Sequence, residues 1–407
     1  MATPTTILGQ SRAIDRLREA LRARHVPHAW IFHGPFGVGK ATAARTFARL
    51  LLDPATTPEA IDRFEPPREG DEAALFDADR HPDLHVIRRE LAAASANREL
   101  RTRKLTNIPL DLLREFMIGG RVGDAPPAVG PVYLTSSRGH GKVFIVEEAE
   151  LLDPVGQNAL LKTLEEPPPR TWIILVTTRA DALLPTVRSR CQVASFGILD
   201  DDAMQAWIAR WLEARDRTPA ETAWLRRFAD GSPGVATFAA RHGLFGWQST
   251  LAPLAATALA GRLPATMVDT MSRLVDELGA ALVKERRNAL AEDAPSGRDD
   301  DDADDDGNGD DAPESLAAGP KGQASVAAAK RDAAAWLLRV LASEAREGLR
   351  AAAAANGNPS PHLRQLDLLV QTERQLDDNV NVRHAFVDFV ALLAAGAPAT
   401  TPFAGVS

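Results

Sequence analysis

Hydrophobic residues in the first half of the chain fall into short runs separated by stretches with helical spacing. The runs predict five β-strands, at residues 29–33, 84–87, 143–147, 172–177 and 192–196. Nearly every position in them is apolar, as in strands of parallel sheets that are covered on both faces. Because helical segments separate the strands, we expect an α/β domain with a doubly wound parallel sheet over residues 1–199.

The pattern becomes helical after residue 200. Apolar side chains recur at spacings of three and four between Met204 and Leu212, which predicts a small helical domain over residues 200–242. Residues 243–400 are rich in alanine and leucine and predict a second all-helical domain. The chain therefore divides into three expected domains.

One acidic insert, residues 291–325, interrupts the last domain. Residues 292–314 carry twelve acidic residues and one basic residue, so the rest of the chain has a formal net charge of +3 although the whole chain has −8. The insert has almost no large apolar side chain and cannot bury enough surface to fold. We expect a disordered, self-repelling loop, and an acidic mimic of DNA is the functional alternative.

Composition narrows the class of protein further. Hydrophobic residues make up 45% of the chain and charged residues 25%, and no run of about 20 apolar residues could span a bilayer. The first residues show neither a basic segment nor an apolar segment that would mark the chain for export, so we expect a cytoplasmic protein without a membrane role. Cys191 is the single cysteine, which excludes an intrachain disulfide.

A glycine-rich segment between the first predicted strand and a helical pattern has the context of a phosphate-binding loop. Its motif residues are Gly34, Gly37, Gly39, Lys40, Ala41 and Thr42. Glycines let backbone N–H groups point at phosphate oxygens, and the lysine would reach the β- and γ-phosphates. Ala41 stands where serine or threonine donates a hydroxyl to magnesium, so the metal loses a ligand.

Thr42 can still contact an α-phosphate oxygen. Phosphate binding can thus outlast hydrolysis, and we expect either ATP or ADP bound without turnover or, alternatively, a glycine-rich turn that binds nothing.

The predicted strand 143–147 ends in a second altered motif. A hydrophobic strand that ends in Asp-Glu usually holds magnesium through the aspartate and polarises the attacking water through the glutamate. Here Glu147 replaces the aspartate, and its extra methylene displaces a metal contact. Glu148 is correctly placed for the water. Ala41 and Glu147 together predict weak hydrolysis or none.

Several segments resemble, in the same order, the signature segments of the bacterial clamp-loader AAA+ family of DNA polymerase III. They are residues 7–10, 28–35, 81–84, 158–168, 184–191 and 375–383. Two segments are specific to this family: Ser189-Arg190-Cys191 and Leu160-Leu-Lys-Thr-Leu-Glu-Glu-Pro-Pro168. The phosphate loop alone would not identify the family. The resemblance implies an AAA+ nucleotide-binding domain, a helical lid and a helical collar that assembles a ring.

The resemblance also implies a role for Arg190, which would reach across a subunit interface as an arginine finger. A forked, permanently charged guanidinium suits the oxygens of a transferring phosphoryl group. The alternative is that Arg190 pairs with a local carboxylate. Gly234 stands where the ATPase subunits of the family have a lid arginine that touches nucleotide.

Partners follow from the same resemblance. They are the gamma/tau and delta subunits of the clamp loader, with the sliding clamp contacted indirectly and primer-template DNA contacted through the assembled complex, at its backbone phosphates.

Members of the family often carry a four-cysteine zinc module before the His-Pro-Asp segment. Residues 53–80 contain no cysteine, so we expect no zinc and no other metal ligand. Residues 119–141, rich in Gly, Pro and Ser, predict a surface loop.

Three hypotheses remain. The first is a clamp-loader subunit that hydrolyses ATP weakly or not at all and supplies a finger to a neighbour. The second is a self-sufficient ATPase of the gamma/tau type, and the third is a helical scaffold that binds neither nucleotide nor clamp loader. Polymerase chemistry is not expected from this chain, since DNA synthesis belongs to another subunit of the holoenzyme.

Overall fold

The computed structural model describes residues 7–23, 25–102, 107–123, 125–212, 217–292, 320–378 and 380–396. These residues form two compact units. Unit 1 comprises residues up to 218 together with 229–237, and unit 2 comprises 219–228 and the residues from 238 onward. The predicted lid, residues 200–242, is thus divided between the two units.

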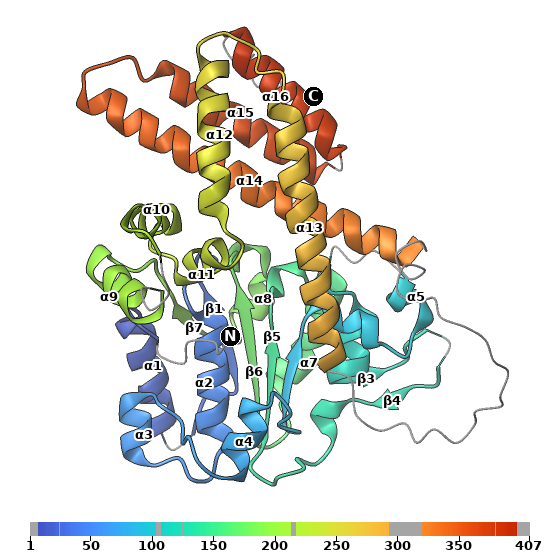
Figure 1. The fold of residues 1–407 in the computed structure, drawn as a ribbon. Coiled ribbons are helices and arrows are strands. Elements are labelled where there is room, and N and C mark those ends of the chain that lie inside the picture. The colour runs from blue at the N-terminus through green and yellow to red at the C-terminus, as the bar shows by residue number, and fades with distance from the viewer. Residues whose placement is uncertain are drawn as a thin grey trace, which may run out of the picture. The chain divides into compact units, whose positions relative to one another are not determined.

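Unit 1 is built on a five-stranded parallel sheet with the strand order β2-β5-β6-β1-β7 (Figure 1). The strands are β1 (Ala29–His33), β2 (Leu84–Ile87), β5 (Lys142–Val146), β6 (Thr171–Thr177) and β7 (Gln192–Ser195). All five predicted strands are present, with bounds that differ by at most one residue from those expected. The doubly wound α/β fold is confirmed.

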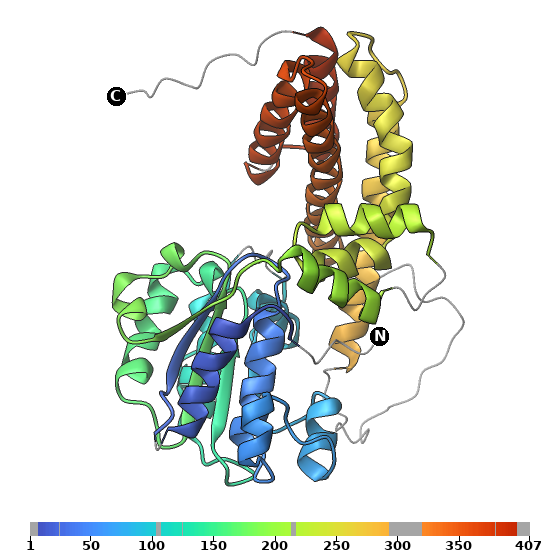
Figure 2. The same cartoon turned by 90° about the vertical axis from the view of Figure 1, so that its left-hand side faces the viewer.

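Helices cover both faces of this sheet (Figure 2). Those that begin in unit 1 are α1 (Ser11–Arg22), α2 (Lys40–Leu52), α3 (Pro58–Arg63), α4 (Asp71–Asp77), α5 (Arg98–Thr102), α6 (Leu110–Leu113), α7 (Pro154–Glu165), α8 (Pro185–Arg188), α9 (Asp201–Trp211) and α11 (Pro233–Arg241). Short helical turns lie at η1 (Arg89–Ala94), η2 (Arg114–Ile118), η3 (Pro131–Tyr133), η4 (Ala149–Leu151) and η5 (Ala180–Ala182).

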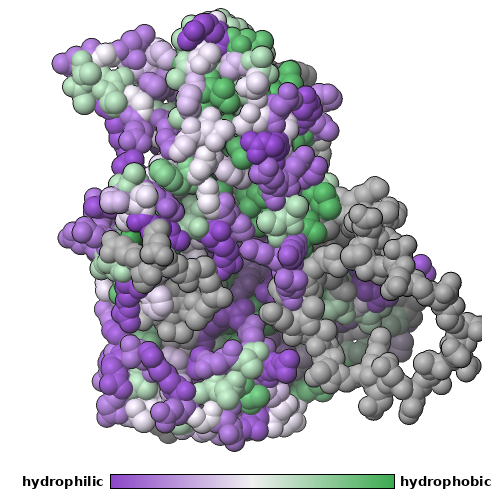
Figure 3. Space-filling view, in the orientation of Figure 1, coloured by the Kyte–Doolittle hydropathy of each residue, from purple (hydrophilic) through white to green (hydrophobic). Residues whose placement is uncertain are grey.

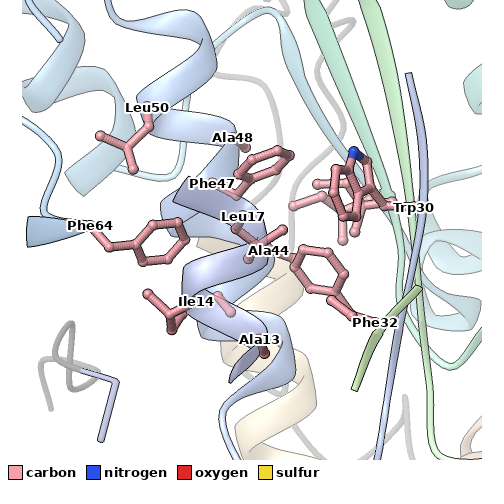
Figure 4. Packing of buried hydrophobic residues seen from close by; sticks show 14 of the residues in the cluster. Ala13, Ile14, Leu17, Trp30, Phe32, Ala44, Phe47, Ala48, Leu50 and Phe64 are labelled. Carbon is pink, nitrogen blue, oxygen red and sulfur yellow. The ribbon is translucent and has the colours of Figure 1, made fainter. Parts of the chain in front are cut away.

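Alternation along the strands explains the two cores. In β1, Trp30 and Phe32 face the core that α1 and α2 cover, whereas Ala29 and Ile31 face the core with α7 and α8. Figure 4 shows Trp30 and Phe32 beside Phe47 of α2, with the Trp30 and Phe47 ring centroids 5.6 Å apart in an edge-on arrangement. Burial of one such aromatic side chain stabilises the fold by about 1.5–3 kcal/mol. This packing fixes α2 against the sheet.

Residues 53–80 lie where a zinc module was considered, and among the described residues no three His, Cys, Asp or Glu side chains are grouped so as to hold a metal ion. Two short helices, α3 and α4, occupy this segment, and Phe64 and Phe76 insert from it into the core shared with α1 and α2. Arg49 of α2 pairs with Asp77, with 2.8 Å between Nη1 and Oδ1, and lies over the Phe76 ring. Apolar burial therefore holds this segment to α2.

Residues 119–141, expected to form a surface loop, contain some regular structure. A two-stranded antiparallel ribbon pairs β3 (Gly119–Gly120) with β4 (Ala128–Val129), and η3 follows it. The buried Lys142 ammonium donates hydrogen bonds to the carbonyls of Pro131 and Val132, each at 2.8 Å. The end of the segment is thereby tied to the start of β5.

Unit 2 is all-helical. Its helices are α10 (Pro219–Ala229), α12 (Leu244–Leu259), α13 (Met267–Glu292), α14 (Pro320–Ala354), α15 (Ser360–Asp377) and α16 (Val382–Ala395). Within this unit the Trp336 and Phe238 rings stack with centroids 3.9 Å apart, and Trp224 stacks on Phe228 at 4.5 Å. No helix in the described ranges is both long and apolar enough to cross a bilayer.

The acidic insert was expected at 291–325. Residues 291–292 end α13 and residues 320–325 begin α14, so both helices extend into the predicted insert. Residues 293–319 lie outside the described residues. In Figure 3 hydrophilic residues cover most of the visible face of α2–α4, whereas hydrophobic patches interrupt the visible face of unit 2.

Candidate functional site

The predicted phosphate loop links β1 to α2, as the motif requires. Gly39, the residue before α2, has φ 100°, and Gly34 has φ 150°. A Cβ on Gly34 would lie 2.1 Å from the carbonyl oxygen of Phe196, so only glycine fits there. The first turn of α2, with its unsatisfied N–H groups, faces the loop and offers donors for phosphate oxygens.

Lys40 is turned into the loop. Its ammonium donates to the carbonyl oxygens of Gly34 at 2.7 Å and Pro35 at 2.6 Å, and the residue is only 6% exposed. Burial lowers the pKa of Lys40 to about 8, although Glu150 opposes the shift. To meet a phosphate, the ammonium must leave these two carbonyls.

The start of α11 lies directly against the loop. Ser232 Oγ donates to the carbonyl of Phe36, and the Gly234 N–H donates to the carbonyl of Gly37, each at 2.8 Å. A Cβ on Gly234 would lie 2.6 Å from Gly37 Cα. Position 234, where an arginine was expected in an ATPase, thus holds a backbone-to-backbone contact that excludes a side chain.

These residues fit a nucleotide phosphate better than they fit magnesium. Ala41 and Thr42 lie in the first turn of α2, and Ala41 has no oxygen to offer a metal. Glu147, expected to displace the metal contact, lies 3.5 Å from Arg45 Nη2 through its Oε1. Arg45 also pairs with Asp79 at 2.8 Å. The positive charge beside the Glu147 carboxylate is therefore that of an arginine.

Glu148 follows β5 with φ 51°, a left-handed backbone that is uncommon for glutamate. Burial raises the pKa of its carboxyl group against the opposite effect of Arg89, whose Nε lies 3.4 Å from Glu148 Oε2. A raised carboxyl pKa is typical of a group that takes a proton from water. Glu148 keeps this property although the metal-binding partners around it are altered.

Sequence reasoning missed Glu150 and Thr178. Glu150 Oε1 accepts a hydrogen bond from the Thr178 N–H at 3.1 Å and another from its hydroxyl. Burial would raise the pKa of Glu150, but hydrogen bonds from Thr178 and Thr177 outweigh burial and lower it. This carboxylate is therefore charged, and it links the end of β6 to the end of β5 near Lys40.

Arg190 lies far from these residues, at the amino end of β7, whereas the phosphate loop lies at the carboxyl end of β1. The chain enters β7 just after Arg190 and leaves it at Phe196 beside Gly34, because β7 runs parallel to β1. Six residues at about 3.3 Å each place roughly 20 Å of strand between Arg190 and the phosphate loop. Arg190 cannot reach the phosphate loop of its own chain.

The Arg190 guanidinium pairs within the chain. Its Nη2 lies 2.5 Å from Glu165 Oε1, and its Nη1 donates to the carbonyl of Thr186 at 2.8 Å. The side chains of Arg190 and Glu165 are 35% and 48% exposed. The local carboxylate considered as an alternative is thus present, and the guanidinium remains accessible. Cys191 beside it is buried, and burial raises the pKa of its thiol to about 12, which makes a reactive thiolate unfavourable.

Comparison with known proteins finds relatives for the first half of the chain. The family model for "DNA polymerase III, delta subunit" matches residues 9–200. The DNA polymerase III subunit delta' of Pseudomonas aeruginosa is 32% identical over 191 residues, which are 47% of this chain and 49% of that protein.

Two relatives carry a different subunit name. The gamma/tau subunit of Mycobacterium tuberculosis is 30% identical over 214 residues, and the tau subunit of Bacillus subtilis is 33% identical over 208 residues. Each match covers 51% of this chain and 31% of the relative. The matched part therefore spans about half or less of each relative. Residues 9–200 are therefore similar to subunits of DNA polymerase III that are named delta, delta' and gamma/tau.

Proposed function

We propose that this chain is the delta prime subunit of a clamp loader, a subunit that hydrolyses ATP weakly or not at all. In this proposal Arg190 acts in trans on ATP held by a gamma/tau neighbour, and the assembled complex loads the sliding clamp onto primed DNA. The polymerase activity of the holoenzyme belongs to another chain.

The position of Arg190 carries this proposal. The residue lies at the opposite end of the parallel strands from its own phosphate loop, and its side chain is accessible. An accessible arginine so far from its own phosphate loop is available to contact a second molecule. A guanidinium beside a transferring phosphoryl group neutralises charge that develops on its oxygens, and such fingers are worth roughly 10³–10⁵ in rate.

The altered phosphate loop supports the second part of the proposal. Ala41 offers no metal ligand, Glu147 lies beside Arg45, and Gly234 packs on Gly37 where an arginine would be needed. These changes affect three separate functions of an ATPase. Phosphate binding through the loop backbone and Lys40 survives them, so ATP or ADP bound without hydrolysis fits the loop.

The test is a complex reconstituted from this chain with gamma/tau and delta subunits. Arg190→Ala should leave folding and nucleotide binding of this chain unchanged and should slow ATP turnover by the complex. The loss should approach the fraction of total ATP turnover that comes from the neighbouring site that Arg190 contacts. Unchanged turnover would remove the proposed role of Arg190, and failure to assemble with the two partners would favour a scaffold without a clamp-loader function.

A second candidate is a gamma/tau-type ATPase that hydrolyses its own nucleotide. Glu148 favours it, because this glutamate stands after β5 at the position from which a carboxylate polarises the attacking water. Identity to the gamma/tau relatives is also similar to that with the delta' relative. The isolated chain should then hydrolyse ATP, and Lys40→Ala should abolish that activity. A chain without measurable turnover rules this candidate out.

A further inference from the structure

Glu165 and Arg190 come from separate helical segments that share one core. Glu165 is the last residue of α7, and Arg190 follows α8. The buried Leu164 and Cys191, next to each of them, pack in the same cluster. The Arg190 N–H also donates to the carbonyl of Val187 at 3.1 Å. Both side chains therefore extend from backbones that the core holds in place.

The Arg190 guanidinium has three partners among the described residues. Nη2 meets Glu165 Oε1, and Nη1 meets the carbonyl of Thr186 and, at 3.4 Å, the Ser189 hydroxyl. A guanidinium has five N–H donors, so hydrogens remain for oxygens of a phosphate. The carboxylate and the carbonyl together restrict the rotamers of a long, half-exposed side chain.

Exposure decides between two roles for this pair. A half-exposed ion pair in water contributes little to folding stability, so Glu165 is poorly suited to a structural role. The same weakness means that Glu165 does not remove the positive charge from Arg190. What the pair supplies is a fixed direction for the guanidinium before a neighbour docks, and prior ordering lowers the entropy lost on docking.

We propose that Glu165 is a positioning residue for Arg190, and that it orients the guanidinium toward the phosphate of a neighbouring subunit. This inference rests on the proposed function of Arg190. Glu165 itself touches no substrate and acts through Arg190 alone.

The experiment measures ATP turnover by the complex with gamma/tau and delta subunits. Glu165→Ala should lower kcat about two- to fivefold, as the loss of an exposed ion pair predicts, while KM for ATP stays unchanged because the nucleotide is held elsewhere. Glu165→Gln keeps an acceptor oxygen and should retain most of kcat. Glu166→Ala removes the next exposed glutamate, for which the described residues show no ion pair, and should have no effect.

A double-mutant cycle separates positioning from a general structural effect. In a complex with Arg190→Ala, adding Glu165→Ala should change nothing further, because the two residues act as one unit. An unchanged kcat in the Glu165→Ala complex overturns the role of Glu165. A loss in the double variant that adds to the loss of Arg190→Ala overturns it as well. Neither outcome affects the proposed role of Arg190. If Arg190→Ala has no effect, the proposed function itself fails and the role of Glu165 fails with it.

Discussion

Lys40 shows how the phosphate loop holds a charge inside the fold. Two loop carbonyls accept hydrogen bonds from its ammonium, yet burial still lowers its pKa to about 8 from the ordinary value of 10.5. The neutral form is therefore favoured in the folded chain relative to the unfolded chain. The charged form that phosphate needs is retained at neutral pH.

This shift predicts a dependence of stability on pH. Between pH 8 and 10.5 the unfolded chain binds more protons than the folded chain, so the free energy of unfolding rises with pH across this window. Between these two pH values the free energy of unfolding of the wild-type protein should rise by up to about 3 kcal/mol more than that of Lys40→Met. Urea unfolding of both proteins at several pH values measures the difference. A difference that stays constant from pH 8 to 10.5 contradicts the buried lysine.

Single residues were predictable where the motif itself carries the chemistry. Gly34, Gly39, Lys40 and Ala41 lie within one short segment, so their order in the sequence fixes their relation in space. The contacts of Ser232 and Glu165 were not predicted, although Glu165 lies in a segment that carries the resemblance. Their roles depend on partners at Phe36 and Arg190, which only the folded chain brings near.

Among the elements, α11 has the closest relation to the site. Its Gly234 approaches Gly37 so closely that an added methyl group must displace backbone. Gly234→Ala should therefore lower the free energy of unfolding by about 1–3 kcal/mol, despite the better helix propensity of alanine. Gly197→Ala is a matched control in the same unit, because a Cβ there has no neighbour within 4 Å. Calorimetry that finds the two variants equally stable contradicts the close packing.

The edge strand β2 carries a second element-scale prediction. His85 pairs with Phe144 of β5, and their rings stack with centroids 4.5 Å apart. Burial lowers the pKa of His85 to about 4 from 6.5, so the folded chain binds fewer protons between these values and loses stability as pH falls from 6.5 to 4.

Replacing the ring tests this cause. Over that pH range the free energy of unfolding of His85→Phe should fall by about 1–3 kcal/mol less than that of the wild type, as measured by chemical unfolding. Equal losses in both proteins would show that another group causes the acid sensitivity.

Elements of the sheet were predictable because continuous apolar runs mark strands that are covered on both faces. The short ribbon of β3 and β4 was not predictable, since Gly119 and Gly120 carry no hydrophobic pattern and pair through their backbone with Val129 and Ala128. The ends of α13 and α14 were also missed, because charged and small residues at 291–292 and 320–325 resemble those of the insert.

At the scale of the whole molecule, the described residues form two compact units, and the division into three domains stays a prediction. Within the predicted lid, residues 229–237 cluster with the sheet and residues 238–242 with the helices of unit 2. Hydrophobic periodicity gave the helices but could not say which core each one joins. Unit 1 contains both the altered phosphate loop and Arg190, at opposite ends of the parallel strands β1 and β7. In the proposed function, the loss of ATP hydrolysis at the loop therefore leaves the arginine finger unaffected.

The central claim is this separation of roles, and two variants of this chain test it in one assay. ATP turnover is measured for complexes with gamma/tau and delta subunits that contain either Lys40→Ala or Arg190→Ala. The account predicts near wild-type turnover with Lys40→Ala, because this chain contributes little hydrolysis, and a large loss with Arg190→Ala. The opposite result, a loss with Lys40→Ala and none with Arg190→Ala, would contradict the account and identify the chain as an ATPase.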